Sequence, residues 1–111
     1  MSPDTAAQPT QIVTTPARFD SGSAPEVERT FQSLVAQGAA RVVCNLEQTE
    51  YVSSAALRVL LAATKSLQRQ GGALVLCSPR PYVAEVLETA GFSQILKVFA
   101  SEAEALAAIS A

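Results

Sequence analysis

Two adjacent serines, Ser53 and Ser54, are the side chains in this sequence best placed to carry chemistry. They stand in the stretch EYVSSAALRVLLAATKSL, where a polar loop gives way to a strongly apolar helix pattern. The unpaired N–H groups of a helix's first turn favour an anion, so that position would tolerate a phosphate on a serine hydroxyl. Serine is also a preferred N-cap residue, which requires no chemistry at all. The local pattern leaves both interpretations open, a helix cap and a phosphorylation switch.

The sequence offers few other groups for catalysis or metal binding. It contains no histidine, which removes the commonest general base and the commonest neutral metal ligand. The usual glycine-rich phosphate loops are missing from it. The carboxylates Asp20, Glu47 and Glu50 could cluster, although solvation at the surface is the commoner fate of such residues. We therefore predict a protein that is not an enzyme and that holds no cofactor and no metal.

Length and composition indicate one folded domain over residues 10–111. The chain has 111 residues, of which 49% are hydrophobic and 16% charged, enough apolar material for a core. Its net charge of −2 comes from interspersed charges, a pattern that does not indicate a nucleic-acid partner. Residues 1–9 are polar and contain proline, which predicts a flexible arm rather than a signal peptide. No segment approaches the roughly 20 continuous apolar residues of a membrane span, so we expect no membrane insertion and a cytoplasmic location.

Hydrophobic periodicity predicts an alternation of strands and helices. Apolar runs predict strands at 10–15, 40–46, 73–77 and 94–99, and a helical stripe follows each of them. Such an alternation indicates an α/β layer with right-handed crossovers. Pro16 weakens the continuation of the first strand, so any pairing through ARF is expected at an edge or a bulge. Cys44 and Cys77 lie inside two of the runs and are predicted as core residues, with a disulfide between them left open.

Helix starts and stops can also be predicted. Ser23 with Glu26 matches the capping-box pattern, and Ser101 with Glu104 matches it again. Ser78, followed by two prolines, is expected to open the third helix. Glycines at 38, 71, 72 and 91 are expected to end the first three helices.

The chain as a whole resembles the STAS domain, and among STAS domains the single-domain bacterial anti-sigma factor antagonists. The segment VVCNLEQTEYVSSAALRVLL is similar to the family pattern of a strand, a loop, an apolar pair and then Asp-Ser-Ser/Thr-Gly-Leu opening a helix. Tyr51 and Val52 occupy the apolar pair, and Leu57 matches the motif leucine. Upstream, ARFDSGSAPEVE places Asp20 on a family aspartate, and the second half from Gly71 onward is similar throughout. The resemblance covers residues 11–110 and implies a small mixed sheet of four to five strands with four helices packed mainly on one side.

The resemblance also implies a role. Such proteins bind an anti-sigma factor that is a serine kinase with a histidine-kinase-like ATPase fold, and this binding frees a sigma factor. The kinase phosphorylates the serine after the motif aspartate, and a PP2C-type phosphatase reverses the reaction. Carried over by position, the acceptor is Ser54, with Ser53 as the alternative. The chain departs from the motif in carrying Ser53 in place of the aspartate and Ala56 in place of the glycine.

The resemblance predicts a partner-binding surface around the two serines. Its predicted members are Asp20, Ser21, Glu47, Glu50, Tyr51, Ser53, Ser54, Ala56 and Arg58. We expect a monomer or a weak dimer. The alternative is a non-phosphorylated scaffold or a subunit of a stressosome-like or lipid-transport complex, which the missing aspartate favours somewhat. Binding of a small ligand is a third, weaker possibility, because no phosphate loop is present.

Overall fold

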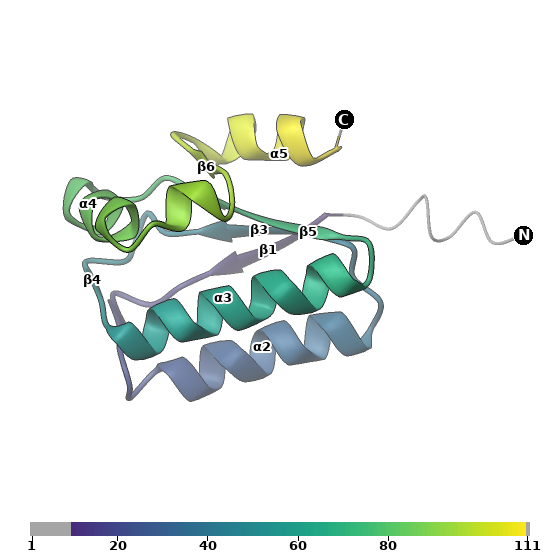
Figure 1. The fold of residues 1–111 in the computed structure, drawn as a ribbon, viewed down its shortest axis with the longest axis horizontal. Helices are drawn as coiled ribbons and strands as arrows, with labels where there is room; N and C mark the ends of the chain where they lie inside the picture. Colours follow the sequence, from purple (N-terminus) through teal and green to yellow (C-terminus); the bar gives the residue numbers. More distant parts are fainter. Residues whose placement is uncertain (1–9, 111) are drawn as a thin grey trace, which may run out of the picture.

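The computed structural model describes residues 10–110 and shows an α/β domain (Figure 1). The predicted arm at residues 1–9 lies outside the described residues, so it stays a prediction. In chain order the elements are β1 (Gln11–Thr14), β2 (Arg18–Phe19), α2 (Ala24–Ala36), β3 (Arg41–Asn45), β4 (Tyr51–Val52), α3 (Ser54–Arg69), β5 (Ala73–Cys77), α4 (Pro81–Thr89), the 3-10 turn η1 (Phe92–Gln94), β6 (Val98–Phe99) and α5 (Glu102–Ser110). Within these residues no helix combines the length and the apolar character needed to cross a membrane.

The strands form one larger and one smaller sheet. The larger sheet has four strands in the order β1-β3-β5-β6, and the pairings described between them are parallel. Strands β2 and β4 pair separately, also in parallel. Pro16 stands between β1 and β2 and lacks the N–H that a continuous strand would need, as the sequence predicted. The fold class expected from the sequence is confirmed.

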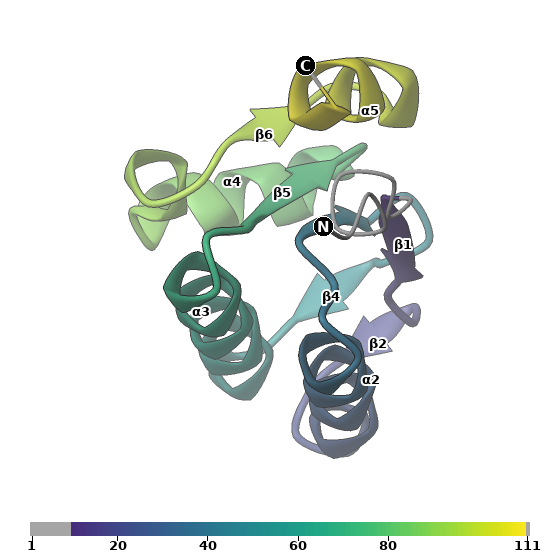
Figure 2. The same cartoon turned by 90° about the vertical axis from the view of Figure 1, so that its right-hand side faces the viewer.

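Helices cover both faces of the larger sheet, but unequally (Figure 2). Helices α2, α3 and α4 pack on one face around the main core, which includes Phe31, Leu60 and Leu87. Helix α5 alone covers the other face, where Ala105 meets Val43 and residues of β5. The prediction of helices mainly on one side is therefore confirmed.

The two cysteines point to opposite faces of the sheet. Cys44 belongs to the main core and Cys77 to the smaller one, because the β3–β5 register aligns Cys44 with Leu76 and Asn45 with Cys77. Both thiols are free and buried, so the core prediction is confirmed and no disulfide joins them. Burial raises the pKa of both thiols, that of Cys44 well above its ordinary value, because a thiolate would lose its hydration there.

Three local predictions are wrong. The QILKVF run is a strand only at Val98–Phe99, which pair with Leu76 and Cys77 of β5, because the chain before them turns through η1. Helix α4 begins at Pro81 with Arg80 as its N-cap, and Ser78 instead adopts a positive φ of 58° in the connecting loop. Ser23 does stand at the N-cap of α2, but its side chain makes no capping hydrogen bond.

Candidate functional site

The two serines have separate places at the start of α3. Ser53 is the N-cap: its backbone is extended, and its Oγ accepts a hydrogen bond from the Ala56 backbone N–H at 3.3 Å. Ser54 is the first residue of the helix, and its side chain is exposed. The structure thus decides which serine caps the helix, which the sequence left open. The Ser54 hydroxyl is accessible to an incoming reagent.

The short β2–β4 pairing brings the turn at Asp20 beside this helix start. Phe19 lies opposite Val52 in the register, and both side chains are buried. The Ser53 backbone N–H donates to the Phe19 carbonyl oxygen at 3.0 Å. Because Asp20 follows Phe19 directly, the Asp20 turn and the first turn of α3 sit at one edge of the fold.

The Asp20 carboxylate is used to shape its own turn. Its Oδ1 accepts from the backbone N–H groups of Gly22 at 3.0 Å and Ser23 at 3.3 Å. Its Oδ2 lies 3.4 Å from Nε of Arg18. The Ser23 hydroxyl donates to the Arg18 carbonyl oxygen at 2.6 Å, which explains why it is not free to cap α2. Asp20 therefore holds the turn that presents Ser21, whose side chain is exposed.

Tyr51 presents an exposed aromatic ring two residues before the cap. The Arg18 guanidinium lies 5.1 Å from the centroid of this ring, a cation–π distance, so one arginine contacts both Asp20 and Tyr51. Aromatic and arginine side chains are the types most enriched where proteins bind one another. Sequence reasoning missed Arg18. A signal was available, because it is the one cation between Pro16 and the Asp20 turn.

The loop carrying Glu47 and Glu50 is anchored mainly through its backbone. The Glu47 N–H donates to the buried Asn45 side chain at 2.8 Å, and the Glu47 carbonyl oxygen accepts from Arg80 at 2.9 Å. Asn45 also donates to Oε1 of Glu102 at 2.7 Å, which ties this loop to α5. The Glu50 N–H bonds the Ala17 carbonyl oxygen, and its side chain is exposed.

The three carboxylates that could have clustered, Asp20, Glu47 and Glu50, do not form a metal site. Within residues 10–110, no group of three or more acidic or cysteine side chains is arranged to hold a metal ion. No hydrogen bond described there joins Asp20 to Glu47 or to Glu50.

The last two predicted contact residues, Ala56 and Arg58, differ in exposure. Ala56 is fully buried in the main core, so its side chain is not part of the exposed surface, and its place among the partner-binding residues stays a prediction. A methyl group here fills core space that the motif glycine would leave empty. Arg58 is exposed on the next turn of α3. The predicted residues that are exposed are therefore Ser21, Glu47, Glu50, Tyr51, Ser54 and Arg58, and the structure adds Arg18.

Comparison with known proteins identifies the family. The profile of the STAS domain matches residues 2–105. BtrV of Bordetella bronchiseptica, named as a candidate anti-sigma factor antagonist, is 42% identical over 89 residues, which span 80% of this chain and 77% of that protein. The crystal structure of an anti-sigma factor antagonist from Mycobacterium paratuberculosis superposes with a TM-score of 0.85 at 20% identity, covering 94% of this chain and 88% of that one. SpoIIAA, a Bacillus cell fate determinant, superposes in its phosphorylated form with a TM-score of 0.71 at 19% identity, covering 90% of each chain. The chain therefore belongs to the STAS domain family.

Proposed function

We propose that this chain is an anti-sigma factor antagonist, a regulatory binding module rather than an enzyme. It binds an anti-sigma factor that is a serine kinase with a histidine-kinase-like ATPase fold, and this binding releases a sigma factor in the cytoplasm. Phosphorylation of Ser54 by that kinase breaks the complex, and a PP2C-type phosphatase restores it. The observation that carries the proposal is the exposed Ser54 hydroxyl at the start of α3, free of the capping role that Ser53 performs.

The relatives support this role. A relative that is 42% identical to this chain over 89 residues is named as a candidate anti-sigma factor antagonist. SpoIIAA, which shares the fold, has been solved in a phosphorylated form. The surface around Ser54 has the composition of a protein contact, with exposed Tyr51 and two arginines, Arg18 and Arg58.

In the phosphoryl transfer, this chain supplies only the acceptor hydroxyl. The Oγ of Ser54 bonds the γ-phosphorus of ATP, the bond from that phosphorus to the bridging oxygen breaks, and ADP leaves. The proton of the hydroxyl must pass to a base. The Asp20 carboxylate is occupied by its own turn and by Arg18, and position 53 carries a neutral hydroxyl. We therefore assign the base to the kinase.

The effect of the phosphate follows from its position. It brings about two negative charges to the first residue of a helix, where the unpaired N–H groups and the helix dipole stabilise an anion. The fold should thus accept the modification without loss of stability. The partner's surface, packed against the same hydroxyl, would face a bulky, strongly hydrated dianion, and the complex would weaken.

A kinase assay tests the acceptor. The full chain, Ser54→Ala and Ser53→Ala are each incubated with the ATPase-fold anti-sigma kinase of the source cell and ATP, and phosphate is located by mass spectrometry. Ser53→Ala should be modified, and Ser54→Ala should not. If Ser54→Ala takes up as much phosphate as the unaltered chain, the assignment is wrong.

A pull-down from the source cell tests the alternative role as a scaffold. Recovery of an ATPase-fold kinase supports the proposal. Recovery of transporter subunits or large assemblies of this chain, without such a kinase, would favour the scaffold instead.

A further inference from the structure

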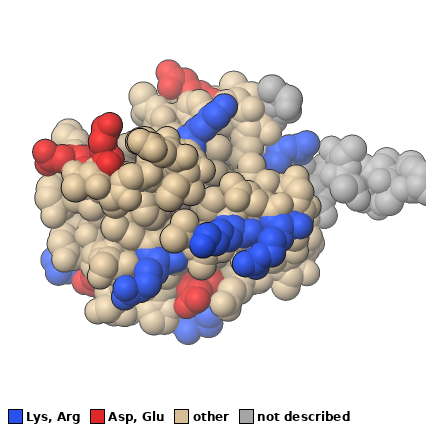
Figure 3. Space-filling view, viewed as in Figure 1, with Lys and Arg blue, Asp and Glu red and all other residues tan. Residues whose placement is uncertain are grey.

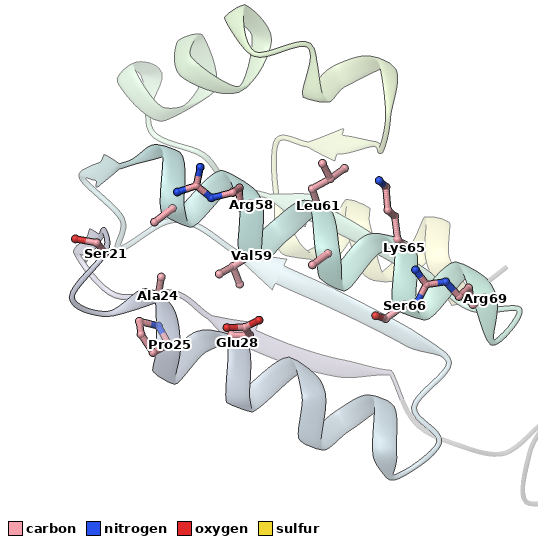
Figure 4. Close-up of a pocket in the computed structure, with 12 residues that line it drawn as sticks. Ser21, Ala24, Pro25, Glu28, Arg58, Val59, Leu61, Lys65, Ser66 and Arg69 are labelled. Carbon is pink, nitrogen blue, oxygen red and sulfur yellow. The ribbon is translucent and has the colours of Figure 1, made fainter.

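A groove runs between α2 and α3 on the outer face of the helix pair (Figure 4). Its volume is about 750 Å³. Its floor includes the buried side chains of Ala24 on α2 and Val59 on α3. The groove exists because small side chains face it, among them Ala55, Ala62 and Ser66 of α3, which leave the space between the helices unfilled. The sequence analysis did not predict this groove.

The rim of the groove on α3 is basic. Arg58, Lys65 and Arg69 line it, at intervals of seven and four residues, and all three are exposed. These spacings place the three cations along one face of the helix. Helix α3 contains no aspartate or glutamate. Figure 3 shows Lys and Arg side chains gathered over the α3 face.

These cations have no carboxylate partner within the described part of the chain. The one ion pair among residues 10–110 joins Arg18 to Asp20. The lining holds one acidic residue, Glu28, which comes from α2 on the opposite rim. The chain as a whole carries a net charge of −2, so this basic stripe stands against an acidic background. An unpaired stripe beside an apolar floor indicates a ligand that carries both apolar and acidic groups.

The length of the stripe sets the size of that ligand. Arg58 and Arg69 are eleven positions apart, and at about 1.5 Å per residue they span about 16 Å along the helix axis. A partner helix of about three turns has the same length. Such a helix would lay its apolar face into the groove, as in other helix-in-groove contacts, and place its carboxylates opposite the three cations.

We propose that this groove docks an acidic amphipathic helix of the anti-sigma factor, so the inference rests on the function proposed above. The groove begins at the switch, because Arg58 lies one turn after Ser54 on the same side of α3. A phosphate on Ser54 is within reach of the Arg58 guanidinium and would withdraw that cation from the rim. Lys65 and Arg69 extend the contact about three to four turns beyond the serine.

Charge reversal at the far end of the groove tests the inference. Lys65→Glu/Arg69→Glu is compared with Arg29→Glu/Lys97→Glu, which changes the net charge equally at exposed residues outside the groove lining. Binding to the anti-sigma kinase is measured at low and at physiological salt, after circular dichroism has confirmed that each variant is folded. We expect the groove variant to bind about tenfold more weakly at low salt, and the control to change by less than about twofold.

The outcomes separate this inference from the proposed function. If the unaltered chain binds the kinase and the groove variant binds equally well, the docking inference is wrong while the function stands. If the unaltered chain binds no anti-sigma factor, both fail. Lys65→Gln/Arg69→Gln removes the two charges without reversing them, so its affinity for the kinase should lie between those of the unaltered chain and the charge-reversal variant. If neither groove variant changes the affinity, the inference is overturned.

A peptide probe tests the groove without the kinase. The full isotope-labelled chain is titrated with a 14-residue helical peptide that carries glutamate on one face and leucine on the other. Amide shifts are expected along residues 55–69 and 21–28. Equal shifts with a lysine version of the peptide, or shifts elsewhere only, would contradict an acid-specific groove.

Discussion

Because Ser53 caps α3 and Ser54 does not, replacing each serine by alanine should have opposite effects on the free energy of unfolding. In Ser53→Ala, α3 loses the acceptor that satisfies the Ala56 N–H. Loss of an N-cap typically costs 0.5–2 kcal/mol, and because the bond measures 3.3 Å and is only partly buried, we expect about 1 kcal/mol of the free energy of unfolding. In Ser54→Ala, an exposed first-turn residue is replaced by the best helix former, so we expect no loss and a gain of up to about 0.5 kcal/mol.

Urea denaturation followed by circular dichroism would measure both changes on the full chain. A loss of about 1 kcal/mol in a domain of this size also lowers the melting temperature by about 4 °C. Ser53→Asp is the matched control, because aspartate is an equally good N-cap and its charge suits the helix dipole, so this variant should be at least as stable as the unaltered chain.

Two results would contradict these separate roles of Ser53 and Ser54. If Ser54→Ala loses as much stability as Ser53→Ala, the second hydroxyl also has a structural role and is not free for modification. If Ser53→Asp is as unstable as Ser53→Ala, the cap hydrogen bond is not what the first serine contributes.

Two further predictions concern the glycines before β5 and the buried thiols. Gly72→Ala should lower the free energy of unfolding by more than about 3 kcal/mol, because a Cβ there would stand 2.1 Å from the Ala40 carbonyl oxygen. Gly71→Ala should lower it by about 1 kcal/mol, because that position has open space but a positive φ of 78°. Chemical denaturation of both variants checks this ranking, and equal losses would contradict it. Stability should also fall above about pH 8.5, where the unfolded thiols ionise while burial raises the pKa of Cys44 and Cys77 in the fold, so that the folded state binds more protons. The loss due to Cys44 should approach about 1.4 kcal/mol per pH unit, and Cys77 adds to it in the same direction. Denaturation of Cys44→Ala in reductant across this pH range should show a shallower slope, and an unchanged slope would contradict the prediction.

Much of the fold is predictable from the sequence because its elements are long or strongly periodic. The stripe of α3 keeps the helical period along its length, and β5 is a continuous apolar run, as expected of a strand buried on both faces. The shortest elements were predictable only in part. Strand β4 is two residues long, and its pairing with β2 depends on long-range contacts that no local pattern encodes. The QILKVF run has strand composition, yet only Val98 and Phe99 pair with β5, because the chain before them turns through η1.

The candidate site was also predictable from the sequence only in part. The family pattern identified Ser54 as a candidate, and local chemistry showed why a helix start suits a phosphate. The choice of cap required the backbone geometry at Ser53. The capping-box pattern at Ser23 was misleading because the Arg18 carbonyl, brought close by the Asp20 turn, competes for the same hydroxyl. The basic groove was overlooked, although the spacing of its cations and the lack of acidic residues in α3 are visible in the sequence.

In the proposed function, modification of Ser54 switches a protein contact without disturbing the fold. The most direct measurement is the dissociation constant for the anti-sigma kinase of the chain carrying phosphate on Ser54, beside that of the unmodified chain. Both should unfold at the same temperature within a few degrees, and the phosphorylated chain should bind at least about tenfold more weakly, since the dianion faces the partner. Equal or tighter binding by the phosphorylated chain would contradict the account.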